Sequence, residues 1–169
     1  LINNAVSRPV ANYQDTAANF DESMRVNATG LFLITRAFGD LMAEKGGGSI
    51  INISSIKGMI GTEPALYTGT DMHGWHPDYF FAKGGMITYT RFIASYYGPR
   101  SVRCNCLSPG GFQTPDHPEA FVRAYCEHTC LGRMANATDL MGSVVFLASD
   151  ASLYVTGTNI PVDGGYTAK

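Results

Sequence analysis

Two long segments of the chain carry apolar residues at helical spacing. The first runs from about Thr16 to Glu44, with Thr16 placed to cap its start and a glycine triplet at 46–48 to end it. The second runs from Tyr79 to about Tyr97 and is apolar over much of its circumference. Such a helix needs cover on more than one side, so we expect it to contact a sheet and also a second subunit.

Short β-branched and apolar runs between these helices predict buried strands. The predicted strands are a tail at Leu1–Asn4, Ser49–Ile53, Val102–Leu107 and Asn159–Val162, and weaker helices are predicted at Pro118–Cys126 and Thr138–Ala148. The segment Ser55–Asp78 is so rich in glycine and proline that we expect no regular element there. Alternating strands and helices indicate an α/β fold, a doubly wound parallel sheet with helices on both faces.

Composition and charge exclude several classes of protein. The 169 residues leave room for one domain, and 45% hydrophobic with 15% charged residues is typical of a folded globular chain. A net charge of -2 gives no basic excess to neutralise phosphates, which makes nucleic acid a poor candidate for the main partner. No apolar run approaches the roughly 18 residues of a spanning helix, so we expect no membrane span.

The four cysteines, at positions 104, 106, 126 and 130, lack the paired spacing of a zinc site. Cys104 and Cys106 lie two apart in a predicted strand, so they should point to one face as small buried apolar groups. We therefore expect reduced cysteines and a cytoplasmic protein. The chain starts without methionine, so this expectation leaves a leader sequence out of account.

The first chemical signal is the pair Tyr79 and Lys83 at the start of the second long helix. Residues four apart lie one above the other on a helix, roughly 5–6 Å apart at Cβ, so the ammonium can lie beside the phenol. Lowering a phenol pKa from ~10 toward ~7 takes about 4 kcal/mol, which one ammonium and a second positive group can supply. Tyr79 can then act as a general acid/base. Taken alone, the pair also fits an amphipathic helix with a surface lysine.

A second signal is the pair Ser54-Ser55, which follows the predicted strand Ser49–Ile53. Open α/β sheets place their binding crevice at this end of a strand, where a serine hydroxyl can bond a substrate oxygen while the tyrosine exchanges its proton. Without the tyrosine, loop capping would explain the serines better.

Six motifs occur in a fixed order along the chain. They are Asn3-Asn4-Ala5, Asn27 in a Val-Asn-Ala-Thr-Gly segment, Ser54-Ser55, Tyr79-x-x-x-Lys83, Pro109-Gly110 with Thr114 downstream, and Val162-Asp163-Gly164-Gly165. Together they resemble the short-chain dehydrogenase/reductase family over essentially the whole chain. The likeness extends to sugar- and polyol-type members with a lengthened segment between the serine and the tyrosine.

The resemblance implies a Rossmann-like fold that binds NAD or NADP and moves hydride between the nicotinamide and a carbonyl/alcohol pair. It implies four catalytic residues: Tyr79 as proton donor or acceptor, Lys83 beside it, Ser55 orienting the substrate oxygen, and Asn27 completing a water-mediated relay at a helix irregularity. The other interpretation of Asn27 is a mid-helix asparagine with its amide in solvent. The cofactor residues that it implies are Asn4, Tyr79, Lys83, Pro109, Gly110, Phe112 and Thr114.

Two segments depart from, or vary within, the family pattern. Thr62–Asp78 looks like an insertion over the substrate pocket, and Gln113–Arg133 stands where the family has a mobile substrate lid. The polar character of both favours a sugar, sugar acid or polyol over a steroid. A metal at His73 and His76 would need further ligands, so we expect polar substrate contacts or a structural role and no metal site.

The family places a glycine-rich phosphate-binding turn ahead of everything in this sequence. Residues 1–169 are therefore expected to form one partial Rossmann-like domain that lacks its N-terminal β-α units. We expect the full protein to be an NAD(P)-dependent dehydrogenase or reductase and a homodimer or homotetramer, and this segment alone to be inactive. The alternatives are a catalytically silent nucleotide-binding or scaffold protein of the same fold and a sugar-nucleotide epimerase or dehydratase.

Overall fold

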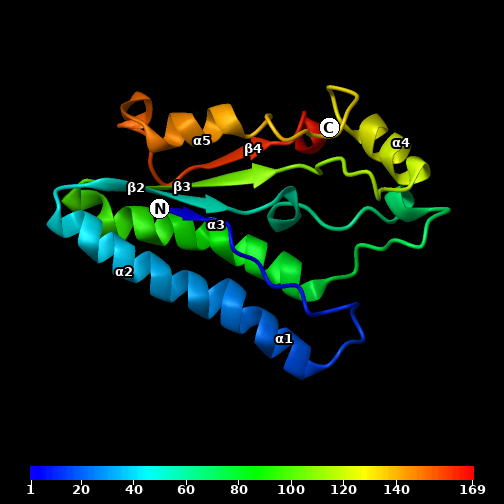
Figure 1. Cartoon of the computed structure of the whole chain (residues 1–169), viewed down its shortest axis with the longest axis horizontal. Coiled ribbons are helices and arrows are strands. Elements are labelled where there is room, and N and C mark those ends of the chain that lie inside the picture. The colour runs from blue at the N-terminus through cyan, green and yellow to red at the C-terminus, as the bar shows by residue number, and fades with distance from the viewer.

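Four parallel strands form one sheet in the computed structural model, which describes residues 1–169. The strands are β1 (Ile2–Asn3), β2 (Gly48–Ile53), β3 (Val102–Pro109) and β4 (Asn159–Val162), and they lie side by side in chain order (Figure 1). In β2, Ile51 pairs with Ile2 on one side and with Asn105 on the other. Because all strands are parallel, their carboxyl ends meet at one edge, where open α/β sheets bind ligands.

Helices cover both faces of this sheet. The helices α1 (Ala17–Met24), α2 (Leu31–Glu44) and α3 (Pro77–Tyr97) lie on one face, and α5 (Met141–Ala148) lies on the other (Figure 1). Successive side chains of β2 point to opposite faces of the sheet: Ile50 packs with Tyr97 of α3, and Ile51 packs with Leu147 of α5. The predicted doubly wound α/β architecture is confirmed.

The two inward-facing cysteines of β3 are buried, as predicted. Cys104 and Cys106 are completely inaccessible to solvent, and all four cysteines are free thiols. Burial raises the pKa of the Cys104 thiol to about 12, which keeps it protonated and unreactive.

The long helical segment predicted from Thr16 to Glu44 is present but contains an irregularity. The Thr16 hydroxyl accepts a hydrogen bond from the Asn19 N–H at 3.2 Å and caps α1. A π-helix at Arg25–Gly30 joins α1 to α2, and it carries Asn27. Gly46 and Gly47 have φ of 91° and 141°, a backbone region open mainly to glycine, and they turn the chain from α2 into β2.

Element boundaries differ from the prediction where side chains cap the backbone. The segment Ser55–Asp78 was expected to hold no regular element, but it contains short 3₁₀ turns at Ile56–Gly58 and Pro64–Tyr67. The Ser55 hydroxyl accepts from the Lys57 N–H and the Glu63 carboxylate accepts from the Ala65 N–H, caps that the glycine and proline count does not reveal. Three other bounds shift slightly: α3 begins at Pro77, β3 continues to Pro109, and α5 begins at Met141.

A second apolar cluster lies beyond the carboxyl edge of the sheet. It joins Thr62–Asp78, the segment expected to be an insertion and called the inserted segment from here on, to α4 (Glu119–His128) and to the chain end. Its buried members are Ile56, Leu66, Phe121, Tyr125, Met134 and Tyr166. The rings of Tyr67 and Phe121 stack with centroids 5.7 Å apart. Every helix of the chain falls short of the length and apolar character that crossing a lipid bilayer requires.

Candidate active site

Tyr79 and Lys83 lie on consecutive turns at the start of α3 and face the same region. The Lys83 ammonium nitrogen is 5.6 Å from the centre of the Tyr79 ring. Lys83 is 5% exposed, and its Nζ donates to the Ile53 carbonyl at the end of β2 at 2.6 Å. Burial lowers the pKa of this ammonium. The strand end therefore holds the lysine beside the phenol.

The two serines after β2 have different partners. The Ser54 hydroxyl donates to the backbone carbonyl of Lys83 at 2.8 Å and ties the strand end to α3. The Ser55 hydroxyl accepts from the Lys57 N–H at 3.1 Å, so its own hydrogen remains available. Gly58 lies so close to α3 that a Cβ there would be 2.6 Å from the Lys83 carbonyl oxygen. These contacts place Ser55 against the turn that carries Lys83.

Asn27 is buried in the π-helix, and its side-chain amide makes three hydrogen bonds. Its Oδ1 accepts from the Ser7 N–H at 2.9 Å, and its Nδ2 donates to the Ser7 carbonyl at 2.7 Å and to the Ser23 hydroxyl at 2.9 Å. The interpretation as a solvent-facing amide is wrong, because the helix irregularity turns this side chain inward. Both amide hydrogens are committed, so a relay at this position has Oδ1 and the backbone carbonyl of Asn27 left to use.

The network continues from Asn27 to the residue before Tyr79. The Ser23 hydroxyl donates to Oδ2 of Asp78 at 2.6 Å, and Asp78 is 1% exposed. The other carboxylate oxygen of Asp78 is buried without a hydrogen-bond partner. A chain of polar contacts thus joins the loop after β1, the π-helix and the first turn of α3.

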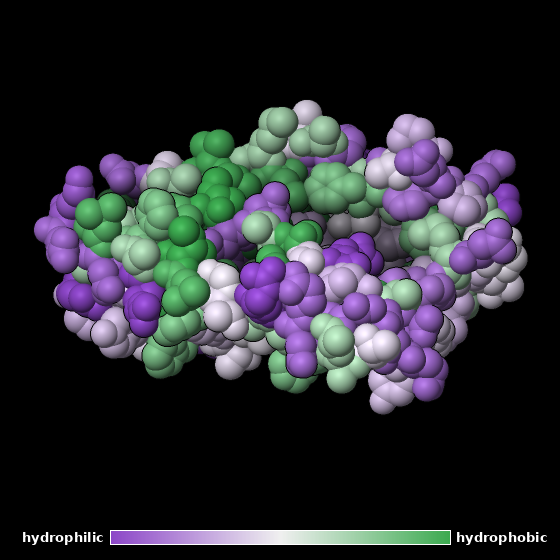
Figure 2. All heavy atoms as spheres, turned by 60° about the horizontal axis from the view of Figure 1, so that its bottom comes forward, coloured by the Kyte–Doolittle hydropathy of each residue, from purple (hydrophilic) through white to green (hydrophobic).

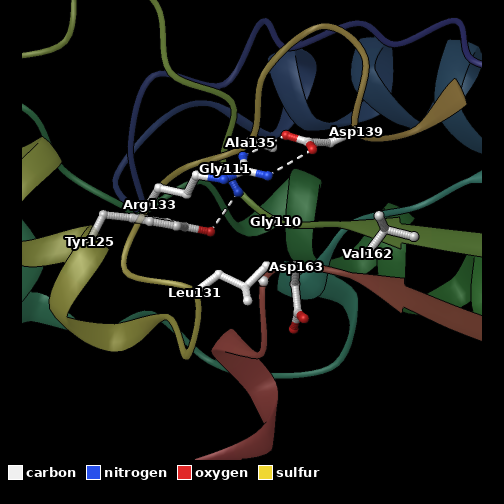
Figure 3. A pocket seen from close by; sticks show the side chains of 10 residues that line it. Gly110, Gly111, Tyr125, Leu131, Arg133, Ala135, Asp139, Val162 and Asp163 are labelled. Atoms are coloured by element: carbon white, nitrogen blue, oxygen red, sulfur yellow. Dashed lines mark hydrogen bonds and ion pairs between the residues drawn. The ribbon is translucent and has the colours of Figure 1, made fainter.

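Two of the expected cofactor residues, Asn4 and Gly110, line separate cavities. Asn4 is exposed and, with Asn27, lines a cavity of about 410 Å³ beside β1. Gly110 lines another cavity of about 220 Å³ between β3, β4 and α4 (Figure 3). Pro109 is buried at the end of β3, and Thr114 is exposed.

Backbone contacts fix the turn after β3. The Gly111 N–H donates to the Tyr125 hydroxyl at 2.5 Å (Figure 3). Phe112 forms a β-bridge with Ala135. Burial raises the pKa of the Tyr125 phenol to about 12, so it stays protonated and holds this turn at neutral pH.

The histidines of the inserted segment do not form a metal centre. The rings of His73 and His76 stack with centroids 4.8 Å apart, and His76 Nδ1 lies 3.0 Å from the Val10 carbonyl. The chain has no group of three or more His, Cys, Asp or Glu side chains placed to hold a metal ion.

Arg8 and Ser23 near the site were not among the expected residues, and the contact of Asp78 with Ser23 was not foreseen. Arg8 places its guanidinium carbon 4.8 Å from the centre of the Tyr79 ring. Ser23 and Asp78 form the buried contact described above. Ser23 was detectable in part, because it lies four residues before Asn27 and so on the same helix face. No local pattern pointed to Arg8.

Comparisons with known proteins identify relatives of this chain. A family model described as Enoyl-(Acyl carrier protein) reductase matches residues 1–167. Galactitol 2-dehydrogenase (L-tagatose-forming) of Cereibacter sphaeroides is 35% identical over 89% of this chain and 58% of its own length. A 3-alpha-(or 20-beta)-hydroxysteroid dehydrogenase of Mycobacterium bovis is 38% identical over 99% of this chain and 60% of its own.

Solved structures match the whole sheet. A short chain dehydrogenase from Leptospira borgpetersenii with bound NAD+ has a TM-score of 0.84 at 35% identity, covering 98% of this chain and 63% of that one. A gluconate 5-dehydrogenase from Burkholderia cenocepacia, in complex with NADP and tartrate, has a TM-score of 0.87 at 29% identity, covering 99% and 64%. The chain therefore spans about 60% of the length of the relatives it matches. The matched fold and the family model together establish that this chain belongs to the short-chain dehydrogenase/reductase family.

Proposed function

We propose that the protein is an NAD(P)-dependent oxidoreductase that interconverts an alcohol and a carbonyl compound, with Tyr79 as the general acid/base. The observation that carries the proposal is the buried Lys83 ammonium, which the Ile53 carbonyl holds 5.6 Å from the centre of the Tyr79 ring. A structural lysine would extend its ammonium to solvent, whereas this one is kept beside a phenol at the ligand-binding edge of the sheet.

The proton chemistry follows from these neighbours. In reduction, the Tyr79 O–H bond breaks and its proton goes to the substrate oxygen while the carbonyl carbon accepts hydride. The positive charge of Lys83 stabilises the phenolate that remains, and in oxidation the phenolate takes the proton back. The free hydrogen of the Ser55 hydroxyl can bond the substrate oxygen and orient it.

The residues present fit a nicotinamide cofactor, which supplies or accepts the hydride when it is bound. Lys83 uses one hydrogen of its ammonium on Ile53, which leaves donors for ribose hydroxyls. Gly110 and Gly111 let the turn after β3 pack closely, since a Cβ on Gly110 would lie 3.0 Å from the Asp163 Cα and one on Gly111 would lie 2.9 Å from the Tyr125 ring. Gly110 also lines the cavity between β3, β4 and α4. Asn4, Pro109, Phe112 and Thr114 complete the proposed cofactor wall.

The proposed substrate is a sugar, sugar acid or polyol. The galactitol and gluconate dehydrogenases among the relatives act on such compounds by their names, although other relatives are named for steroids. The segment Thr62–Asp78, which ends one residue before Tyr79, carries exposed polar groups that include Asp71 and His73, together with the exposed ring of Trp75. These groups suit a hydroxylated substrate better than a steroid.

The proposed assembly is a homodimer or homotetramer formed through α2 and α3. Hydrophobic residues gather over the half of this face where α2 lies (Figure 2). The exposed apolar side chains include Phe32, Leu33, Ile34, Phe38 and Leu41 of α2 and Phe81, Phe92 and Tyr96 of α3. An apolar groove of about 220 Å³ runs between the two helices. A second copy presenting the same face would bury this surface.

Substitution of Tyr79 tests the function directly. In the full-length protein, Tyr79→Phe should lower kcat by about 10²–10⁴-fold and leave the Kd of the cofactor nearly unchanged, since only the transferable proton is lost. Tyr154→Phe, on a fully exposed side chain after α5, is the control and should keep full activity. Undiminished turnover by Tyr79→Phe contradicts the proposed role of Tyr79. Absence of wild-type turnover on every alcohol tested with both cofactors contradicts the oxidoreductase.

A further inference from the structure

Arg8 is an exposed cation beside the proposed catalytic phenol, and no group of the chain pairs with it. Its guanidinium carbon lies 4.8 Å from the centre of the Tyr79 ring. The two ion pairs of the chain join Arg25 to Glu22 and Arg133 to Asp139, and neither involves Arg8. The contact with the ring face uses none of the five N–H donors of the guanidinium.

The neighbouring charges do not neutralise Arg8. The nearest charges on α3 are the Lys83 ammonium, 5.6 Å from the centre of the same ring, and the Asp78 carboxylate. Asp78 is buried and bonded to Ser23, on the inner side of the helix. On the loop after β2, Lys57 donates to the Gly61 carbonyl, and Glu63 is the carboxylate near it. The surroundings of Tyr79 therefore hold an excess of positive charge in a chain whose net charge is -2.

The position of Arg8 faces the inserted segment as well as the phenol. Burial raises the pKa of Tyr67, in the second 3₁₀ turn, and the charge of Arg8 opposes that rise. Repulsion from Arg8 also adds to the lowering of the Lys83 pKa that burial causes. The guanidinium thus lies over the Tyr79 ring, and its charge acts on Lys83 and Tyr67 as well. In the proposed function, a substrate that reaches the Tyr79 hydroxyl therefore comes near this cation.

We propose that Arg8 binds a carboxylate of the substrate, so that the protein selects acidic hydroxy or keto compounds such as sugar acids over neutral polyols. The planar guanidinium presents paired N–H donors that match the two oxygens of a carboxylate. A carboxylate a few bonds from the reacting carbon can reach Arg8 while the reacting oxygen contacts Tyr79. The inference rests on the proposed oxidoreductase function and names the substrate class that this site takes.

The test compares matched substrates that differ in charge. Full-length wild type, Arg8→Gln and Arg8→Lys are assayed with gluconate against glucitol and galactonate against galactitol, using NAD+ and NADP+. Wild type should prefer the acid of each pair. Arg8→Gln should lower kcat/KM for the acids by about ten- to a hundredfold, mainly through KM, and change the neutral polyols less than about threefold. Arg8→Lys should keep part of the preference, since it retains the charge without the fork.

Arg100→Gln is the matched control, because Arg100 also lies over aromatic rings, 4.6 Å from the centre of the Tyr97 ring, but beyond the opposite end of α3. It should leave both substrate classes unchanged. An equal loss of kcat/KM on acids and polyols in Arg8→Gln overturns the proposal. A shift in the pH profile of kcat with both substrate classes also overturns it, because Arg8 would then act by modulating Tyr79.

Weaker binding of the cofactor alone by Arg8→Gln also overturns the proposal, since the anion would then be a cofactor phosphate. A wild-type preference for the polyols, or turnover of neither pair, contradicts it as well. These failures remain distinguishable from failure of the oxidoreductase itself, in which no alcohol of any charge gives Tyr79-dependent turnover.

Discussion

The Ser23 hydroxyl donates to the Asp78 carboxylate at 2.6 Å, across 55 positions of sequence. This is the single hydrogen bond that the buried carboxylate receives, because its other oxygen has no partner. Asp78 occupies the first turn of α3, where the helix dipole favours a negative charge. The contact joins α1 to the turn that carries Tyr79, so its loss should affect both stability and the site.

Ser23→Ala should lower the free energy of unfolding by about 1–3 kcal/mol, because it leaves a buried carboxylate without a partner. Urea denaturation measures the change. Glu22→Ala is the control, since Glu22 forms an exposed pair with Arg25 and should shift the midpoint little. Adding Asp78→Asn to Ser23→Ala removes the charge and should restore part of the stability. A Ser23→Ala protein as stable as wild type would show that the contact contributes nothing.

Gly58→Ala should separate the serine loop from α3. The added Cβ would meet the backbone of Lys83 at 2.6 Å, and backbone cannot move aside as a flexible side chain can. We expect a loss of about 1–3 kcal/mol in stability together with lower kcat, because Ser55 shifts relative to Lys83. Gly61→Ala, which meets no atom within 4 Å, is the control and should be neutral. Equal behaviour of the two variants in denaturation and kinetics would refute the close approach.

Tyr125 and Tyr166 should behave oppositely when their hydroxyls are removed. Tyr125→Phe deprives the Gly111 N–H of its acceptor and should cost about 1 kcal/mol, whereas the buried Tyr166 hydroxyl has no partner and Tyr166→Phe should be neutral or stabilising. Denaturation at pH 7 separates them. Equal destabilisation by both would contradict the assigned contacts.

The same tyrosines predict an alkaline limit to stability. Burial raises the pKa of each phenol to about 12, above the ~10 of an unfolded chain. The stabilisation from keeping these phenols protonated is complete below pH ~10 and is lost as the pH rises through about 12. Denaturation midpoints of wild type should therefore fall over this window, and those of Tyr166→Phe should fall less. An identical decline in both proteins would exclude Tyr166 as a cause.

The fold was predictable because burial leaves a regular pattern in the sequence. The β-branched run of β2 and the run of small and apolar residues in β3 are largely buried, and apolar residues recur at helical spacing in α2 and α3. The boundaries were less predictable, since they depend on individual caps. Ser55 and Glu63 start 3₁₀ turns inside a segment whose glycine and proline content indicates only loop.

The candidate site was predictable only where its residues are close in sequence. The spacing of Tyr79 and Lys83 predicted one shared helix face, and the Lys83 ammonium lies 5.6 Å from the centre of the Tyr79 ring. Ser55 and Asn27 were expected from the family resemblance, and their catalytic roles stay predictions. Contacts between residues far apart in the chain have no local sequence pattern that indicates them. The Ser23–Asp78 bond and the position of Arg8 over Tyr79 depend on how α1, α3 and the loop after β1 pack, which needs the tertiary structure.

Phe92→Asp should weaken assembly if α3 forms the subunit interface. Phe92 is 61% exposed within the aromatic row that Tyr89 and Tyr96 complete, and a buried unpaired carboxylate there would oppose association. Light scattering at micromolar concentration should show an oligomer for wild type and a smaller species for the variant. Tyr154→Asp, on a fully exposed side chain after α5, should assemble normally. A monomeric wild type would contradict the proposed assembly.

The shared apolar cluster of Leu66 and Phe121 has a consequence for how substrate preference can change. Because the inserted segment and α4 bury their side chains against each other, neither can be exchanged for a relative's version without exposing the other's apolar face. Grafting the two segments together should therefore preserve folding, whereas grafting either one alone should not. A change of substrate specificity through these segments would require both to be replaced as a pair.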